Sequence, residues 1–192
     1  VGNRKTPGPE GGVQADESIR PETTAEGLAK LKPAFDRENG TVTPGNASQI
    51  NDGAAATAVV SEAFAKELGL KPMARIVSYA TSGVQPKDIF AAPIEGVKGA
   101  VKKAGLTLDD IDLFELNEAF AAQMLCNTKA LGIPEAKLNV CGGGIALGHP
   151  IGASGARVLT TLLHQMARTG AKRGLAGLCL GGGNSVAMVV EA

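Results

Sequence analysis

Two side chains that can do acid–base or nucleophilic chemistry stand in glycine-rich segments of this sequence. His149 lies in the run GGGIALGHPIGASG, and Cys179 lies in the run LCLGGG. Glycine has no side chain, so the backbone of such segments can approach a ligand closely. Asn117 adds an amide in the upstream run NEAF. Together these residue types indicate a site for thioester and enolate chemistry.

His149 is followed by Pro150, which restricts the backbone of His149 to extended conformations. A neutral imidazole at such a turn can donate to a carbonyl oxygen and stabilise an oxyanion, a contribution of about 3 kcal/mol per donor. The ring can equally take a proton from a thiol as a general base. A third interpretation is that the ring only caps a turn, and spacing alone leaves all three open.

Cys179 is near the end of a predicted buried strand and opens onto Gly181. Free backbone N–H groups gather at such a place, and a thiol there serves as nucleophile or as acid and base, depending on its thiolate fraction. The alternative is an inert core cysteine, the commonest fate of a lone buried one. We interpret Cys126 and Cys141 as structural, and we assign His164 no function.

Asn117 lies where a predicted strand passes into a predicted helix. It is therefore either the N-cap of that helix or a group that holds a water against a substrate carbonyl. Ser48, in the run GNAS, stands in a segment that reads by itself only as a loop.

Composition limits the partners and the compartment. Lys plus Arg balance Asp plus Glu at 19 each, which argues against binding to nucleic acid or to an anionic membrane. The sequence shows no long apolar run and no signal-peptide pattern. Its three cysteines are widely spaced, as in a protein of the cytoplasm or an organelle matrix rather than a disulfide scaffold or a zinc site.

The elements that position these residues alternate along the chain. Residues 1–21 read as an exposed extension. Strands are predicted at residues 54–60, 74–80, 112–116, 175–180 and 185–190, and helices at residues 23–35, 61–68, 94–104, 119–131 and 154–168. This alternation predicts a layered α/β fold with helices on the faces of a sheet. The three glycines between the last two strands favour antiparallel pairing of those strands.

Four segments, in this order, resemble the thiolase family of acetyl-CoA acetyltransferases and 3-ketoacyl-CoA thiolases. They are GNAS with NDG at 45–53, NEAF at 117–120, GHP at 148–150 and CLGGG at 179–183. The resemblance covers the chain from about Asp16 onward. It implies one half of the layered thiolase fold, with a mixed five-stranded sheet and helices on both faces. Residues 1–46 would be the tail of the loop domain that covers the substrate, and residues 47–192 the C-terminal domain.

The resemblance also implies a reaction, the Claisen condensation of two acetyl-CoA to acetoacetyl-CoA or the reverse thiolysis. Cys179 matches the cysteine that removes the proton next to the thioester. His149 matches the residue that activates the nucleophile and binds the thioester oxygen, and Asn117 matches the anchor of a water in that oxyanion hole. The N–H of Gly181 matches a donor in a second oxyanion hole, and Ser48 matches a contact to the pantetheine arm of CoA.

The partners implied by the resemblance are acyl-CoA substrates, an N-terminal thiolase half with the nucleophilic cysteine, and further copies of the chain in a dimer or tetramer. No cofactor is implied, because CoA thioesters are the substrates. Since that half is not in this sequence, we expect the chain alone to be inactive or insoluble. One alternative is a non-catalytic acyl-CoA-binding or assembly subunit of thiolase fold. A ketoacyl synthase relative is disfavoured, because those enzymes use histidines where this chain has Cys179.

Overall fold

The computed structural model describes residue 16 and residues 18–192, so most of the predicted N-terminal extension lies outside the described residues. The chain divides into two compact units, Val1–Lys32 and Pro33–Ala192. The first unit contains the short helix α1 (Ala25–Ala29), where Oγ1 of Thr24 accepts from the N–H of Gly27 at 3.0 Å. This helix is shorter than predicted. Leu28 and Leu31 are both exposed, so no buried apolar stripe extends it, and a helix rarely continues up to a proline such as Pro33.

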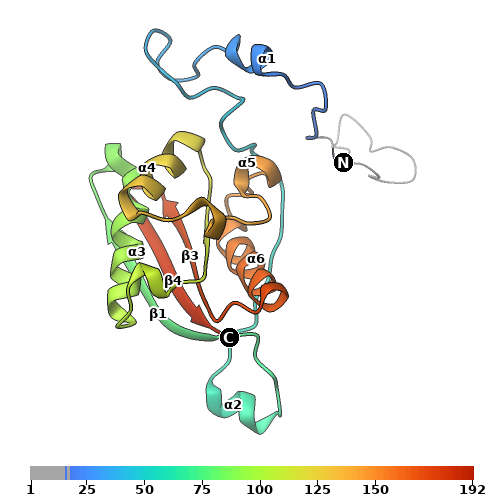
Figure 1. Cartoon of the computed structure of the whole chain (residues 1–192), viewed down its shortest axis with the longest axis vertical. Helices are drawn as coiled ribbons and strands as arrows, with labels where there is room; N and C mark the ends of the chain where they lie inside the picture. Colours follow the sequence, from blue (N-terminus) through green and yellow to red (C-terminus); the bar gives the residue numbers. More distant parts are fainter. Residues whose placement is uncertain (1–15, 17) are drawn as a thin grey trace. The chain divides into compact units, whose positions relative to one another are not determined.

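The second unit is built on a sheet of four strands, in the order β1-β4-β3-β2. The strands are β1 (Arg75–Gly83), β2 (Leu113–Leu116), β3 (Arg173–Leu180) and β4 (Asn184–Glu191). β2 runs parallel to β3, while β4 runs antiparallel to both β3 and β1. Figure 1 shows β4 between β1 and β3. The sheet is therefore mixed, and the predicted antiparallel pairing of the last two strands is confirmed.

The number of strands differs from the prediction of five. Residues 54–60, the first predicted strand, form no strand and are almost all exposed. A run of small residues buries little apolar surface, and these residues pair with no other strand among the described residues. A single parallel bridge between Phe114 and Leu138 lies instead beyond β2, at the opposite edge from β1.

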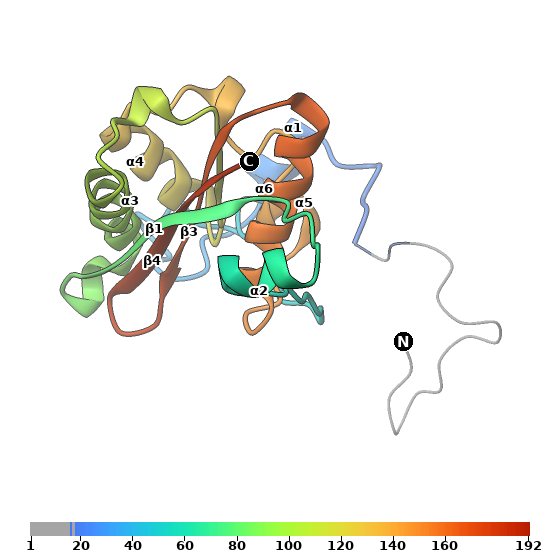
Figure 2. The same ribbon diagram turned by 90° about the horizontal axis from the view of Figure 1, so that it is seen from below.

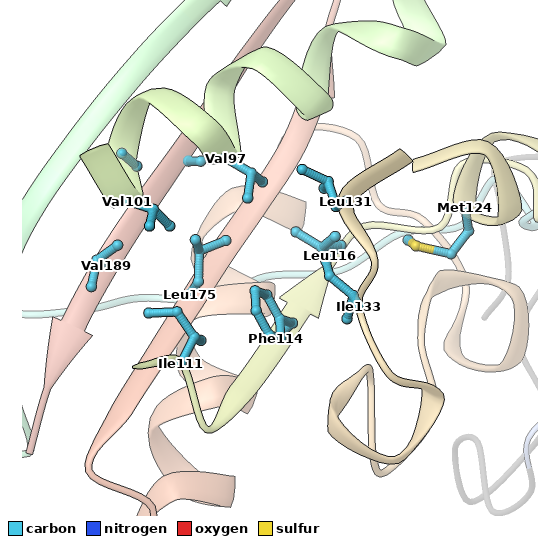
Figure 3. Close-up of a cluster of buried hydrophobic side chains, with 12 residues drawn as sticks. Val97, Val101, Ile111, Phe114, Leu116, Met124, Leu131, Ile133, Leu175 and Val189 are labelled. Atoms are coloured by element: carbon cyan, nitrogen blue, oxygen red, sulfur yellow. The ribbon is translucent and has the colours of Figure 1, made fainter. Parts of the chain in front are cut away.

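Helices cover both faces of the sheet, as predicted (Figure 2). α3 (Ala92–Lys103) and α4 (Ala121–Leu131) pack on one face. Their apolar side chains meet Phe114, Leu175 and Val189 in a buried cluster (Figure 3). The long helix α6 (Ser154–Thr169) packs on the other face.

α6 follows directly from its sequence pattern. Val158, Leu162 and Met166 repeat every four residues and are each 1% exposed, which is the apolar stripe of a helix that packs on a sheet. Gly170 ends the helix with φ of 74°, a left-handed conformation that glycine adopts freely.

The remaining helical segments are short: α2 (Glu62–Glu67), η1 (Pro86–Ala91), η2 (Leu108–Asp110), η3 (Glu135–Lys137) and α5 (Gly144–Leu147). α2 confirms the helix predicted at residues 61–68, and Ser61 caps it. Among the described residues, no helix is both long enough and apolar enough to cross a membrane.

Candidate active site

His149 stands between α5 and α6, in a turn fixed by its own backbone. Gly148 precedes it with φ of 92°, a conformation that strongly favours glycine. The N–H of His149 donates to the carbonyl of Gln49 at 2.8 Å. The ring is half-buried, and the segment before α2 thus holds the turn that presents it.

Each ring nitrogen of His149 has a polar neighbour. Nδ1 lies 2.6 Å from Oγ of Ser154, and that hydroxyl donates to the carbonyl of Pro150 at 3.1 Å. A hydroxyl has one hydrogen, so Ser154 accepts from Nδ1–H and leaves the lone pair on Nε2. The ring therefore contacts a side chain through each of its two nitrogens.

Asn117 faces Nε2 of His149, with its Nδ2 atom 3.4 Å away, at the outer limit of a hydrogen bond. The N-cap interpretation of Asn117 is wrong, because α4 begins at Ala121 with Phe120 as its N-cap residue. Asn117 is instead 1% exposed, and its N–H donates to the carbonyl of Gly177 in β3 at 2.9 Å. Asn117 thus lies next to His149 because it directly follows the last residue of β2.

A buried ion pair lies behind Asn117 and was not singled out from the sequence. Arg157 of α6 donates from Nη1 to Oε1 of Glu115 at 2.7 Å and from Nη2 to Oδ1 of Asn117 at 3.3 Å. The side chain of Glu115 is 2% exposed, and burial raises the pKa of this carboxyl to about 7 although Arg157 lowers it. A glutamate inside the apolar strand LFEL was the available signal, since a buried carboxyl requires a partner.

Electrostatics keep His149 neutral. Burial lowers the pKa of its ring below the usual value, and the positive charge of Arg157 adds to this effect. A neutral ring with a free lone pair can accept a proton from a thiol.

Glu118 joins the NEAF segment to the glycine-rich segment before His149. Its carboxylate accepts from Nδ2 of Asn139 at 2.6 Å and from the N–H of Ile145 at 3.2 Å. A Cβ at position 143 would overlap this carboxyl group, so a side chain there would displace the Glu118 carboxylate from its hydrogen bonds. Sequence reasoning treated Glu118 only as part of its motif.

Cys179 lies at the same end of the sheet as Asn117, near the end of β3, and on the opposite face. It pairs in register with Ser185, whose Oγ donates to the carbonyl of Ala92 in α3 at 3.0 Å, whereas Asn117 contacts α6. Burial raises the pKa of the Cys179 thiol above its usual value. No hydrogen bond links Cys179 to His149 within the described residues, so the contacts bring together His149 and Asn117 but not Cys179.

Gly181 and Ser48 occupy different surroundings. Gly181 is exposed in the turn between β3 and β4, and its carbonyl accepts from Nδ2 of Asn184 at 3.2 Å. Ser48 is half-buried and donates through both its N–H (3.1 Å) and its Oγ (3.0 Å) to the carbonyl of Ala119. Cys126 and Cys141 are exposed. In the described part of the chain, no three His, Cys, Asp or Glu side chains gather as they would around a metal ion.

Comparison with protein families decides which fold family this is. The family model for the thiolase C-terminal domain matches residues 70–192, and the model for the thiolase N-terminal domain matches residues 3–63. The chain belongs to the thiolase family. The first match ends at residue 63 and the second begins at residue 70. The division into domains between residues 46 and 47 stays a prediction.

Individual thiolases are similar over nearly the whole chain. The acetyl-CoA acetyltransferase of Chromobacterium violaceum is 58% identical over 177 residues, which are 92% of this chain and 45% of the relative. The 3-ketoacyl-CoA thiolase of Cronobacter sakazakii is 58% identical over 179 residues, 92% of this chain and 46% of the relative. The chain therefore spans about half the length of these relatives.

Solved thiolase structures show the same fold. The acetyl-CoA acetyltransferase of Bacillus anthracis superposes with a TM-score of 0.88 at 49% identity, covering 92% of this chain and 45% of that one. Human mitochondrial 3-ketoacyl-CoA thiolase in complex with CoA superposes with a TM-score of 0.84 at 42% identity, covering 94% of this chain and 45% of that one.

Proposed function

We propose that this thiolase chain supplies the proton-transfer and oxyanion half of an active site that condenses two acetyl-CoA to acetoacetyl-CoA, or cleaves the product with CoA. The observation that carries the proposal is the half-buried ring of His149, with Nε2 3.4 Å from Nδ2 of Asn117 and a pKa that burial lowers, in a chain of the thiolase family. The nucleophilic cysteine comes from a part of the protein that this sequence does not contain.

In the first half of the reaction, Nε2 of His149 takes the proton of the nucleophilic thiol. The thiolate attacks the carbonyl carbon of acetyl-CoA, and Nε2–H then donates to the oxyanion together with a water held by Asn117. The bond between the acetyl carbon and the CoA sulfur breaks. The leaving thiolate takes the proton of Cys179, so that Cys179 is left as a thiolate.

In the second half, the Cys179 thiolate removes the α-proton of a second acetyl-CoA. The enolate carbon attacks the acetyl-enzyme, whose oxyanion accepts from the N–H of Gly181. The new carbon–carbon bond displaces the nucleophilic thiolate, which recovers its proton from His149. The products are acetoacetyl-CoA and CoA, and all three side chains return to their starting protonation.

The binding roles belong to the same proposal. Ser48 contacts the pantetheine arm of CoA, and the chain works with an N-terminal thiolase half in a homo-oligomer. The human 3-ketoacyl-CoA thiolase that this chain resembles was solved with CoA, which supports an acyl-CoA as the ligand.

A fusion of this chain with the portion of the Chromobacterium violaceum relative that it does not cover tests the function; we call it the full-length fusion. We expect intact-mass spectrometry after brief exposure to acetyl-CoA to show one acetyl adduct, located outside this chain. The His149→Gln variant should form the adduct more slowly, and the exposed His164→Gln on α6 is its matched control.

Two results would count against this function. Binding of CoA without any acetyl adduct would indicate a binding role in place of catalysis. Thiolysis by the 192-residue chain alone would show that no outside nucleophile is needed.

A further inference from the structure

The side-chain amide of Asn117 has a polar partner at each end, one at its oxygen and one at its nitrogen. Oδ1 faces Nη2 of Arg157 at 3.3 Å, and Nδ2 faces Nε2 of His149 at 3.4 Å. A guanidinium group donates hydrogen bonds and cannot accept them. If the amide were rotated by half a turn, its NH₂ group would point at another donor. Arg157 therefore determines which end of the amide reaches the histidine.

Arg157 is itself fixed in place. Its side chain is 17% exposed and pairs with Glu115, which is 2% exposed and comes from β2. One guanidinium thus bridges Glu115 and Asn117, two positions on the same face of β2 and its extension. A planar guanidinium can serve both partners in one geometry, which the point charge of a lysine cannot do.

The orientation of the amide has a consequence for His149. With NH₂ toward the ring, Nε2 has to accept, and its proton resides on Nδ1 beside Ser154. With the amide oxygen toward the ring, Nε2 would have to donate, and the Ser154 hydroxyl would turn from the carbonyl of Pro150 toward Nδ1. The amide and the ring tautomer therefore change together.

We propose that Arg157, held by Glu115, is a positioning residue that fixes the amide of Asn117 and thereby selects the His149 tautomer with its proton on Nδ1. Only this tautomer has a lone pair on Nε2 with which to deprotonate a thiol. The catalytic consequence rests on the proposed function, whereas the tautomer itself does not.

The direct test is ¹⁵N nuclear magnetic resonance of histidine-labelled full-length fusion at neutral pH, because the ¹⁵N shift distinguishes protonated from unprotonated ring nitrogens. The His149 signals are assigned by difference from His149→Gln. We expect a single neutral form in the unaltered protein, with the proton on Nδ1. Arg157→Lys should add a population with the proton on Nε2.

Two further variants guard the interpretation. Glu115→Leu combined with Arg157→Met removes both charges, so that neither remains buried without a partner, and it should give the same mixed signals. Arg168→Met, on the exposed side of the same helix, should give the unaltered spectrum. An unchanged His149 tautomer in both Arg157 variants would overturn the proposal, whether or not the fusion forms an acetyl adduct.

Kinetics then test whether the effect reaches catalysis through Asn117. We expect Arg157→Lys to slow acetyl-enzyme formation roughly tenfold or more with little change in KM, since part of the contribution of a positioned base is lost. Asn117→Ala should slow it as well, and the double variant should be no slower than Asn117→Ala alone. Independent, multiplying losses would show that Arg157 does not act through Asn117.

Discussion

Which ring nitrogen carries the proton decides what His149 can do. Ser154 lies at Nδ1 and Asn117 at Nε2, and burial together with the charge of Arg157 lowers the pKa of the ring. Cys179 is in the opposite situation, because burial keeps its sulfur as a thiol. Two residues that look alike in the sequence, each beside glycines, are thus prepared for different proton-transfer steps.

The lowered pKa of His149 predicts the acid limb of the pH profile. Protonation removes the lone pair on Nε2, so the rate of acetyl-enzyme formation falls with pH only below the usual histidine pKa of about 6.5. The measurement is kcat/KM of the first half-reaction in the full-length fusion as a function of pH. A midpoint at or above the usual histidine pKa would contradict the prediction.

The raised pKa of Cys179 predicts slow alkylation. Since the thiolate is the reactive form, iodoacetamide should modify Cys179 more slowly at neutral pH than the exposed Cys126 and Cys141. Its rate should rise as the pH is increased. Peptide mass spectrometry over time gives the three rates, and Cys179 reacting first at neutral pH would disagree with this prediction.

At the scale of elements, short segments between strands and helices join distant parts of the chain. Glu118, between β2 and α4, accepts from the N–H of Ile145 in α5, and the carbonyl of Gln49 accepts from the N–H of His149. These two hydrogen bonds lie outside the strands of the sheet. The position of His149 therefore depends on close approach between loops.

Gly143 tests this close approach. Its backbone angles, φ −114° and ψ −159°, are open to other residues, so only the overlap with the Glu118 carboxyl opposes a side chain. We expect Gly143→Ala to cost about 1–3 kcal/mol in the free energy of unfolding and to slow acetyl-enzyme formation.

Gly152→Ala is the matched control, because a Cβ at position 152 meets no atom within 4 Å. Urea unfolding and the acetylation rate of the two variants are compared in the full-length fusion. Equal behaviour of the two would show that Glu118 and Gly143 do not hold the turn.

At the scale of the whole molecule, polar groups are enclosed between two apolar layers. The cluster under α3 and α4 and the cluster under α6 sandwich the sheet, and the pair of Glu115 and Arg157 lies on the α6 face. A groove of about 970 Å³ is also open on that side, between α6, α2 and residues 56–60. Burial of a carboxyl this deep links the stability of the fold to pH.

Glu115 predicts the sign of that linkage. Its pKa rises from the usual 4.5 to about 7 on folding, so over this range the folded state keeps a proton that the unfolded state has lost. The free energy of unfolding should therefore fall as the pH rises across the range, by on the order of a few kcal/mol. In Glu115→Gln this decline should be absent.

The measurement is the urea midpoint of the full-length fusion at several pH values. Glu95→Gln, on the exposed side of α3, is the control and should keep the decline of the unaltered protein. An equal decline in Glu115→Gln would assign it to other groups.

The sequence by itself determined whatever depends on neighbouring residues. The period of Val158, Leu162 and Met166 defined α6, Ser61 capped α2, and glycines marked the turn between β3 and β4. The order of its motifs indicated the thiolase family, and matches to both thiolase family models confirm that membership.

Only the tertiary structure decided how side chains from separate elements meet. Glu115 and Arg157 are 42 positions apart, and nothing local pairs them until α6 packs on β2. The same packing placed Asn117 beside His149 instead of at the N-cap of α4, and it left residues 54–60 outside the four-stranded sheet. Local propensity depends on residues that are close together in the sequence. A buried polar group instead bonds to a partner on whichever element packs over it.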